Sequence, residues 1–142
     1  MTLAEVTSTA VHTLRTAGVD SPELDAEILL AQVVGHDRTW ILAHREYTLS
    51  HTEQKNFGGL LAQRAARVPI AYLTGHKEFW GLDFQVDARV LVPRPDTETL
   101  VEEAFARLDE TAVAAPRIAD VGTGSGALAI VLGRHRAGAS VV

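Results

Sequence analysis

The sequence predicts a protein of the α + α/β class, in which a helical bundle is followed by a β-hairpin linker and by the first βαβ part of an α/β sheet. Three observations predict this order. Apolar residues recur at helical spacing through the first half of the chain. They then alternate with polar residues over "KEFWGLDFQVDARVLV". A short apolar run, a glycine-rich turn and a further apolar helix pattern follow.

Two helices are expected in the first 35 residues. The first should end near Gly18 and carries an apolar stripe made of Leu3, Val6, Ala10, Val11, Leu14 and Ala17. The second should be capped by Ser21, with Pro22 at the first helical position, where its missing N–H would be unpaired in any case. Gly35 can end this helix, whose apolar residues include Leu24, Ile28, Ala31 and Val34.

Two more helices complete the predicted bundle. Asp37 is expected to cap a short helix that carries Trp40, Ile41 and Leu42. Ser50 and Glu53 have the spacing of a capping box, in which each side chain satisfies a free amide of the other residue. The helix that they open should end at Pro69 and carries Phe57, Leu60, Leu61 and Val68. Residues 1–68 are therefore interpreted as a helical domain.

The middle of the chain changes to a period of two. Alternation from Phe79 to Val92 predicts a β-hairpin or a pair of short strands, within a linker assigned to residues 69–95. Pro93 and Pro95 break this pattern. Asp96 can then cap a helix whose expected buried face consists of Leu100, Val101, Ala104, Phe105 and Leu108.

Residues 96–142 are interpreted as the incomplete start of an α/β domain. After a polar, alanine-rich loop over residues 109–116, we expect a buried strand over Ile118–Val121, the glycine turn, a helix to about His135, and the start of a second strand. Such a sheet needs several strands before its faces are covered. We therefore expect residues 118–142 to be poorly ordered, or covered by another chain that associates through an exposed sheet edge, although the parent protein should be a monomer.

Composition and charge narrow the class of protein. The 142 residues are 46% hydrophobic and 22% charged, which is typical of a globular protein. The sequence has no cysteine, which excludes thiolate zinc sites and cysteine nucleophiles and fits a cytoplasmic location. A net charge of −5 without basic runs predicts no direct nucleic-acid partner, and no apolar stretch approaches the ~20 residues that span a membrane. The scattered histidines lack metal-ligand spacing, so no metal is predicted.

The stretch "ADVGTGSGALAI" is the strongest ligand-binding signal. Glycines between a strand and a helix let the backbone approach a ligand, and the helix start adds free amides. Gly122, Gly124 and Ala127 fit the dinucleotide pattern G-x-G-x-x-G/A. Asp120, Gly122, Gly124 and Gly126 also fit the loop that binds S-adenosylmethionine (SAM), where a carboxylate lies near the cationic methionine moiety. The turn by itself leaves both ligands open, beside a tight turn without a ligand.

Four longer segments resemble a known family. "DAEILLAQVVGHDR", "RVPIAYLTGHKEFWGLDFQV", "VLVPRPDTETLVEEA" and "IADVGTGSGALAIVL" occur in this order. Together they closely resemble the HemK/PrmC family, the peptide chain release factor N5-glutamine methyltransferases, over nearly the whole chain. The segments Glu78–Gly81 and Pro93–Glu98 are more specific than the glycine loop. The ribosomal-protein glutamine methyltransferases are the nearest alternative.

The resemblance implies a helical N-terminal domain that helps to recognise the substrate, a hairpin linker, and a Rossmann-like SAM-dependent methyltransferase domain. The implied substrate and partner is a class I release factor, methylated on the glutamine of its Gly-Gly-Gln motif. The implied cofactor contacts are Asp120, Gly122, Thr123, Gly124, Ser125 and Gly126. The implied substrate-binding residues are Phe79, Trp80, Arg94 and Pro95, with an aromatic plug and a surface arginine as alternative interpretations.

One family motif is missing from the sequence. The Asn-Pro-Pro-Tyr motif, which holds the substrate amide near the SAM methyl group, is absent, and the single asparagine is Asn56. We therefore assign no catalytic residue, and expect that these 142 residues alone do not catalyse methyl transfer and bind SAM weakly or not at all. An NAD-binding oxidoreductase and a non-enzymatic helical interaction module remain alternatives. Methylation of a release factor with labelled SAM tests the expectation.

Overall fold

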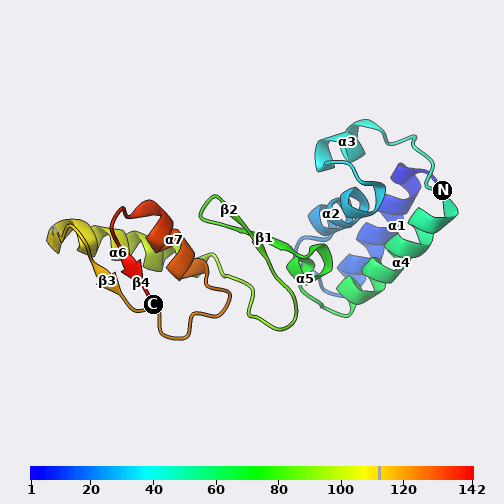
Figure 1. Cartoon of the computed structure of the whole chain (residues 1–142). Coiled ribbons are helices and arrows are strands. Elements are labelled where there is room, and N and C mark those ends of the chain that lie inside the picture. Colours follow the sequence, from blue (N-terminus) through cyan, green and yellow to red (C-terminus); the bar gives the residue numbers. More distant parts are fainter. Residues whose placement is uncertain (112) are drawn as a thin grey trace. The chain divides into compact units, whose positions relative to one another are not determined.

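The chain forms two compact units, Met1–Thr74 and Gly75–Val142, in a computed structural model that describes residues 1–111 and 113–142 (Figure 1). The first unit is helical. The second contains helices and two small sheets. The architecture is therefore a mixture of α and β structure. Among the described residues, no helix is both long and apolar enough to cross a membrane.

The N-terminal unit is built on three helices of two or more turns that share one core. Its elements are α1 (Leu3–Thr16), α2 (Pro22–Val34), α3 (Arg38–Ala43), α4 (His51–Ala65) and α5 (Ile70–Thr74). Helix α1 packs against α2 and α4, and α2 also contacts α3, α4 and α5. The core consists of Leu3, Val6, Ala10, Leu14, Val19, Ala26, Leu29, Leu30, Ile41, Leu49 and Phe57. The first helix and its end near Gly18 are confirmed.

Helix caps follow the predicted chemistry at two of three positions. The Ser50 hydroxyl accepts from the Glu53 N–H, and the Glu53 carboxylate accepts from the Ser50 N–H at 2.7 Å, which confirms the capping box. Asp37 accepts from the Trp40 N–H, as predicted. Ser21 is the N-cap residue of α2 and Pro22 opens the helix, as predicted, but the Ser21 side chain makes no cap hydrogen bond. Its ψ of 64° differs from the extended value of 164° at Ser50, so the hydroxyl does not face the free amides of α2.

The most buried side chains of α2 are not the apolar residues named from the sequence. Leu24 is exposed, and Ile28 is only half-buried. The side chains that reach the core are Ala26, Leu29 and Leu30. Because α2 has neighbours on several sides and is apolar over most of its surface, the apolar spacing does not identify one core face.

A buried carboxylate also lies on α2. Asp25 is 5% exposed, and its Oδ2 lies 2.6 Å from Nε of Arg64 on α4. Arg64 also donates to the Val68 carbonyl at 3.0 Å. The guanidinium therefore lets a carboxylate lie within the helical bundle.

The end of α4 lies earlier than predicted. The helix ends at Ala65, before Val68, because Arg67 adopts a left-handed φ of 70° and donates to the Gly18 carbonyl. Pro69 does not end the bundle. It precedes the short helix α5, which the sequence analysis did not predict.

The capping box at α4 gives a testable contribution to stability. Hydrogen bonds from the Ser50 hydroxyl and N–H lower the pKa of Glu53 below its ordinary value of 4.5. A lowered carboxyl pKa stabilises the fold above that ordinary value, and this stabilisation disappears as the pH falls. We expect Ser50→Ala to reduce the free energy of unfolding by about 1 kcal/mol at pH 7.

Urea denaturation at several pH values measures this effect. The difference between wild type and Ser50→Ala should shrink between pH 6 and pH 3, as Glu53 becomes protonated. Thr52→Ala, an exposed substitution in the first turn of the same helix, is the control. A difference that does not change with pH would contradict the role of Glu53.

The C-terminal unit begins with the predicted hairpin. Strands β1 (His76–Phe79) and β2 (Leu82–Gln85) pair antiparallel, with Phe79 opposite Leu82. The alternation that continued to Val92 does not extend the strands beyond Gln85. The hairpin is therefore confirmed, but it is shorter than its sequence pattern.

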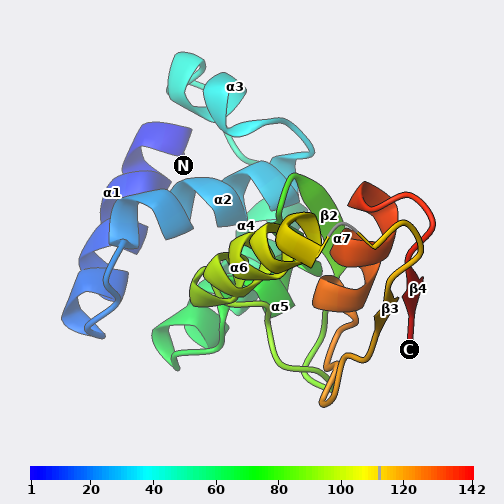
Figure 2. The ribbon, with the colours of Figure 1, turned by 90° about the vertical axis from the view of Figure 1, so that its left-hand side faces the viewer.

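The rest of this unit is one βαβ motif preceded by a helix. Helix α6 (Asp96–Thr111) leads to β3 (Arg117–Ile118), α7 (Ala127–His135) and β4 (Ser140–Val141). Strands β3 and β4 are parallel and lie side by side, and α7 joins them (Figure 2). The predicted order of strand, turn, helix and second strand is confirmed. The loop expected over residues 109–116 includes residue 112, which lies outside the described residues, and its first part belongs to α6.

Three expectations in this unit were wrong in detail. Asp96 is the first residue of α6 and not the residue before it. Leu100 is exposed, because Val101 occupies the buried position of that turn. Strand β3 is only two residues long, and Val121 is 93% exposed because it already belongs to the turn that leads to the glycines.

Candidate cofactor site at the glycine loop

A cavity of about 160 Å³ lies beside the glycine loop of the C-terminal unit. One wall comes from the segment before α6 and from the first turn of that helix. The other wall comes from the loop after β3 and from the start of α7. The lining residues are Leu91, Val92, Pro93, Arg94, Thr97, Asp120, Gly122, Thr123, Gly124, Ser125, Ala127 and Leu128.

The loop backbone requires its glycines. Gly122, Gly124 and Gly126 have φ values of 83°, 57° and 76°, in the left-handed region that residues with a Cβ rarely adopt. Gly126 closes the turn by donating to the Thr123 carbonyl at 2.9 Å, and it is the N-cap residue of α7. The first amides of α7 thus begin at the cavity, where helix geometry leaves them without carbonyl partners.

Asp120 provides the most informative polar group at this cavity. Its backbone N–H donates to the Val142 carbonyl at 2.7 Å, which fixes the residue beyond the end of β3. Its Oδ2 is buried and has no hydrogen-bond partner among the residues that the structure describes. A buried acceptor without a donor is costly. The carboxylate therefore suits a ligand that brings a hydrogen-bond donor or a positive charge.

The structure brings together part of the predicted site. Asp120, Gly122, Thr123, Gly124 and Ser125 all line the cavity, on the wall that follows β3. Arg94 lines the opposite wall, although its side chain is exposed. Gly126 does not line the cavity and acts through the start of α7.

The other predicted substrate residues lie outside this lining. Phe79 is 1% exposed and packs edge-on against Phe84, with ring centroids 6.2 Å apart. Trp80 is half-buried in the hairpin turn, with its ring 6.2 Å from that of Phe105. Pro95 is exposed, next to the lining residue Arg94. Phe79 therefore has the environment of an aromatic plug inside the hairpin.

Several lining residues were missed by sequence reasoning. Leu91, Val92 and Thr97 form much of the wall opposite the loop, and Leu128 adds a contact from α7. Residues 90–92 were predicted to end a strand, and the prolines after them to break it. The sequence feature that could have indicated this wall is Leu91, an apolar residue two positions before Pro93. The structure leaves Leu91 66% exposed at the cavity.

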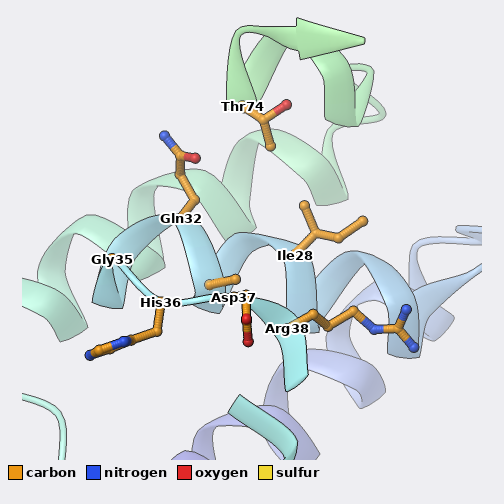
Figure 3. A pocket seen from close by; sticks show the side chains of 8 residues that line it. Ile28, Gln32, Gly35, His36, Asp37, Arg38 and Thr74 are labelled. Atoms are coloured by element: carbon orange, nitrogen blue, oxygen red, sulfur yellow. The ribbon is translucent and has the colours of Figure 1, made fainter. Parts of the chain in front are cut away.

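A larger and wider cavity of about 560 Å³ lies in the N-terminal unit (Figure 3). It is formed where α2 ends and α3 begins, and its charged side chains already have partners. Asp37 caps α3, and Arg38 pairs with Glu27 at 2.5 Å. The His36 ring stacks on Trp40 at 4.0 Å, and Figure 3 shows His36 and Arg38 pointing away from one another. The charged side chains of this cavity are therefore less available to bind a ligand than the buried carboxylate oxygen at the glycine loop.

No group of metal-binding side chains occurs in either described range. Three or more histidine, aspartate or glutamate residues do not converge within residues 1–111 and 113–142. The site at the glycine loop consists instead of backbone amides, hydroxyls, apolar side chains and one carboxylate. These features define a mixed α and β protein with a strand–glycine loop–helix site of the kind that binds a nucleotide-like cofactor.

Comparison with known sequences assigns the family. The model of the PrmC N-terminal domain matches residues 5–75, and the chain belongs to this family. The release factor glutamine methyltransferase of Salmonella typhimurium is 50% identical over 127 residues, covering 89% of this chain and 44% of the relative. The Escherichia coli protein of the same name is 46% identical over 123 residues, covering 87% of this chain and 43% of the relative. The chain thus spans less than half the length of these curated relatives.

Proposed function

We propose that this chain is the N-terminal portion of a release factor glutamine methyltransferase. The similarity to proteins of that name extends over 89% of the chain and therefore includes both units. In this proposal the helical unit recognises a class I release factor, and the C-terminal unit begins a Rossmann-like domain that binds SAM. The Rossmann-like assignment is supported by the parallel pair β3 and β4 joined by α7.

The Oδ2 atom of Asp120, which is buried without a hydrogen-bond partner among the described residues, carries the choice of cofactor. SAM presents an ammonium group and a positively charged sulfonium, either of which can lie favourably beside a buried carboxylate. The pyrophosphate of a dinucleotide is anionic, and Asp120 would repel it at this position. This charge favours SAM over NAD, although the glycine spacing fits both ligands.

The remaining lining residues have complementary roles in this proposal. Loop amides and the Thr123 and Ser125 hydroxyls can hold the polar part of SAM, while Leu91 and Leu128 offer apolar surface. When bound, SAM would supply an electrophilic methyl group. The chain's own contribution is to orient the cofactor and exclude water from one side of it. The sequence contains no Asn-Pro-Pro-Tyr motif, and we expect no turnover by these 142 residues alone.

Ligand titration of the ¹⁵N-labelled chain tests the choice of cofactor. NMR is suitable because it detects the weak binding expected here. SAM should shift the amide resonances of residues 122–126 and 91–97, whereas NAD⁺ at the same concentration should not. Shifts with NAD⁺ and none with SAM would favour the oxidoreductase. S-adenosylhomocysteine, which lacks the sulfonium charge, is the matched ligand control.

Titration with an unlabelled class I release factor tests the partner. We expect its addition to perturb resonances of residues 1–74, and a release factor with an altered Gly-Gly-Gln motif is the control for the substrate segment. Release-factor binding without any SAM response would favour the non-enzymatic interaction module. Binding of a ribosomal protein in place of the release factor would favour the sister group of methyltransferases.

A further inference from the structure

The turn of the β1–β2 hairpin has an unusual backbone. Trp80 and Gly81 occupy its two central positions, with φ values of 53° and 72°. Two positive φ values define the type I′ hairpin turn, in which Asn-Gly and Gly-Gly are the usual pairs. A bulky residue is strained in this region of conformational space. Neighbouring groups must therefore hold Trp80 in place.

Two carboxylates bind the N–H groups of this turn. Glu78 Oε1 accepts from the Gly81 N–H at 2.5 Å, within the hairpin itself. Glu98 Oε1 accepts from the Trp80 N–H at 3.1 Å, and Glu98 lies in the first turn of α6. The second hydrogen bond therefore ties the strained residue of the hairpin to a different element.

Aromatic packing fixes the same turn to α6 at a second point. The Trp80 ring is tilted against Phe105, with ring centroids 6.2 Å apart. The Phe105 ring in turn packs in a T-shaped arrangement with the ring of His135 on α7, with ring centroids 6.3 Å apart. The N–H and the ring of Trp80 therefore contact α6 at two separate residues, Glu98 and Phe105.

The first turn of α6 also carries one wall of the glycine-loop cavity. The Thr97 N–H donates to the Arg94 carbonyl at 3.0 Å, and the Glu98 N–H donates to the Pro95 carbonyl at 2.8 Å. Arg94 and Thr97 line the cavity, whereas Glu98 does not. The backbone turn that positions the Glu98 carboxylate is thus the turn that positions both lining residues.

We propose that Glu98 is a positioning residue for the glycine-loop cavity. Its carboxylate holds the Trp80 turn against α6 and so fixes the wall formed by Arg94 and Thr97 at the distance from the glycine loop that the ligand needs. The identity of that ligand as SAM rests on the proposed function, whereas the role of Glu98 in placing the wall is independent of which ligand binds.

Two substitutions at Glu98 separate positioning from simple folding. Glu98→Ala removes the acceptor, while Glu98→Gln keeps an oxygen that accepts the Trp80 N–H. Glu102→Ala, an exposed change one turn further along α6, is the matched control. We expect Glu98→Ala to accelerate hydrogen exchange of the Trp80 amide at least tenfold, to shift the Arg94 and Thr97 resonances, and to weaken SAM binding at least fivefold. Glu98→Gln and Glu102→Ala should stay within twofold of wild type.

Each readout can overturn a different part of the proposal. Unchanged exchange at Trp80 in Glu98→Ala would remove the hydrogen-bond role, and unchanged Arg94 and Thr97 resonances would remove the positioning role. A loss of SAM binding that Glu98→Gln does not restore would also contradict it. If wild type gives no response to SAM while the Trp80, Arg94 and Thr97 signals change as expected, the proposed function fails and the positioning of the wall by Glu98 stands.

Discussion

Replacing Arg64 with methionine is expected to lower the free energy of unfolding of the N-terminal unit by about 3–5 kcal/mol. The carboxylate of Asp25 is buried in α2 and has its ion pair with Arg64, at 2.6 Å. Removing the guanidinium leaves that charge buried without its partner, and the Val68 carbonyl also loses a donor. Urea denaturation followed by circular dichroism at pH 7 measures the loss.

Two further variants separate the effect of the lost Arg64 charge from the effect of changed side-chain packing. Arg45→Met removes an exposed arginine that makes no ion pair within the described part of the chain, and should change stability by less than about 0.5 kcal/mol. Combining Arg64→Met with Asp25→Leu should recover much of the loss, because a paired apolar replacement leaves no unpaired charge. A loss below about 1 kcal/mol for Arg64→Met would show that Asp25 does not depend on this partner.

The extent of sequence-based prediction differs between local and distant interactions. Capping at Ser50 and Asp37 was predicted because both partners lie within three residues of one another. The pairing of Asp25 with Arg64 joins residues 39 positions apart, and no local pattern indicates it. The core face of α2 depends on four neighbouring helices, so the apolar residues named from the sequence do not by themselves identify it.

At the candidate site, too, the local features were predicted from the sequence and the long-range contacts were not. The glycine turn between β3 and α7 was predicted from glycines between an apolar run and a helix pattern, and the structure has positive φ at Gly122, Gly124 and Gly126. The opposite wall could not be derived, because the approach of Leu91 and Thr97 to the loop is a tertiary contact that no local pattern indicates. Asn or Gly would have been expected in the left-handed position that Trp80 occupies.

Asp120 provides the sharpest test of the cofactor assignment. We expect Asp120→Asn to weaken SAM binding at least tenfold, equivalent to about 1.4 kcal/mol, because the neutral amide no longer attracts the cationic part of the ligand. The NMR titration with SAM measures this change. Asp83→Asn is the matched control, since Asp83 is an exposed carboxylate on β2 outside the cavity lining.

Stability distinguishes a ligand-binding carboxylate from a structural one. The Oδ2 atom of Asp120 is buried without a hydrogen-bond partner in the described residues, so its charge stabilises nothing there that the structure shows. Asp120→Asn should therefore leave the free energy of unfolding unchanged or raise it, since a buried unpaired charge is removed. A variant that unfolds more easily and still binds SAM as wild type does would place Asp120 in the fold and not in the cofactor site. If Asp120→Asn loses SAM binding while its stability is unchanged, the carboxylate of Asp120 serves to bind the ligand. Its burial then costs free energy that the positive charge of the bound ligand offsets.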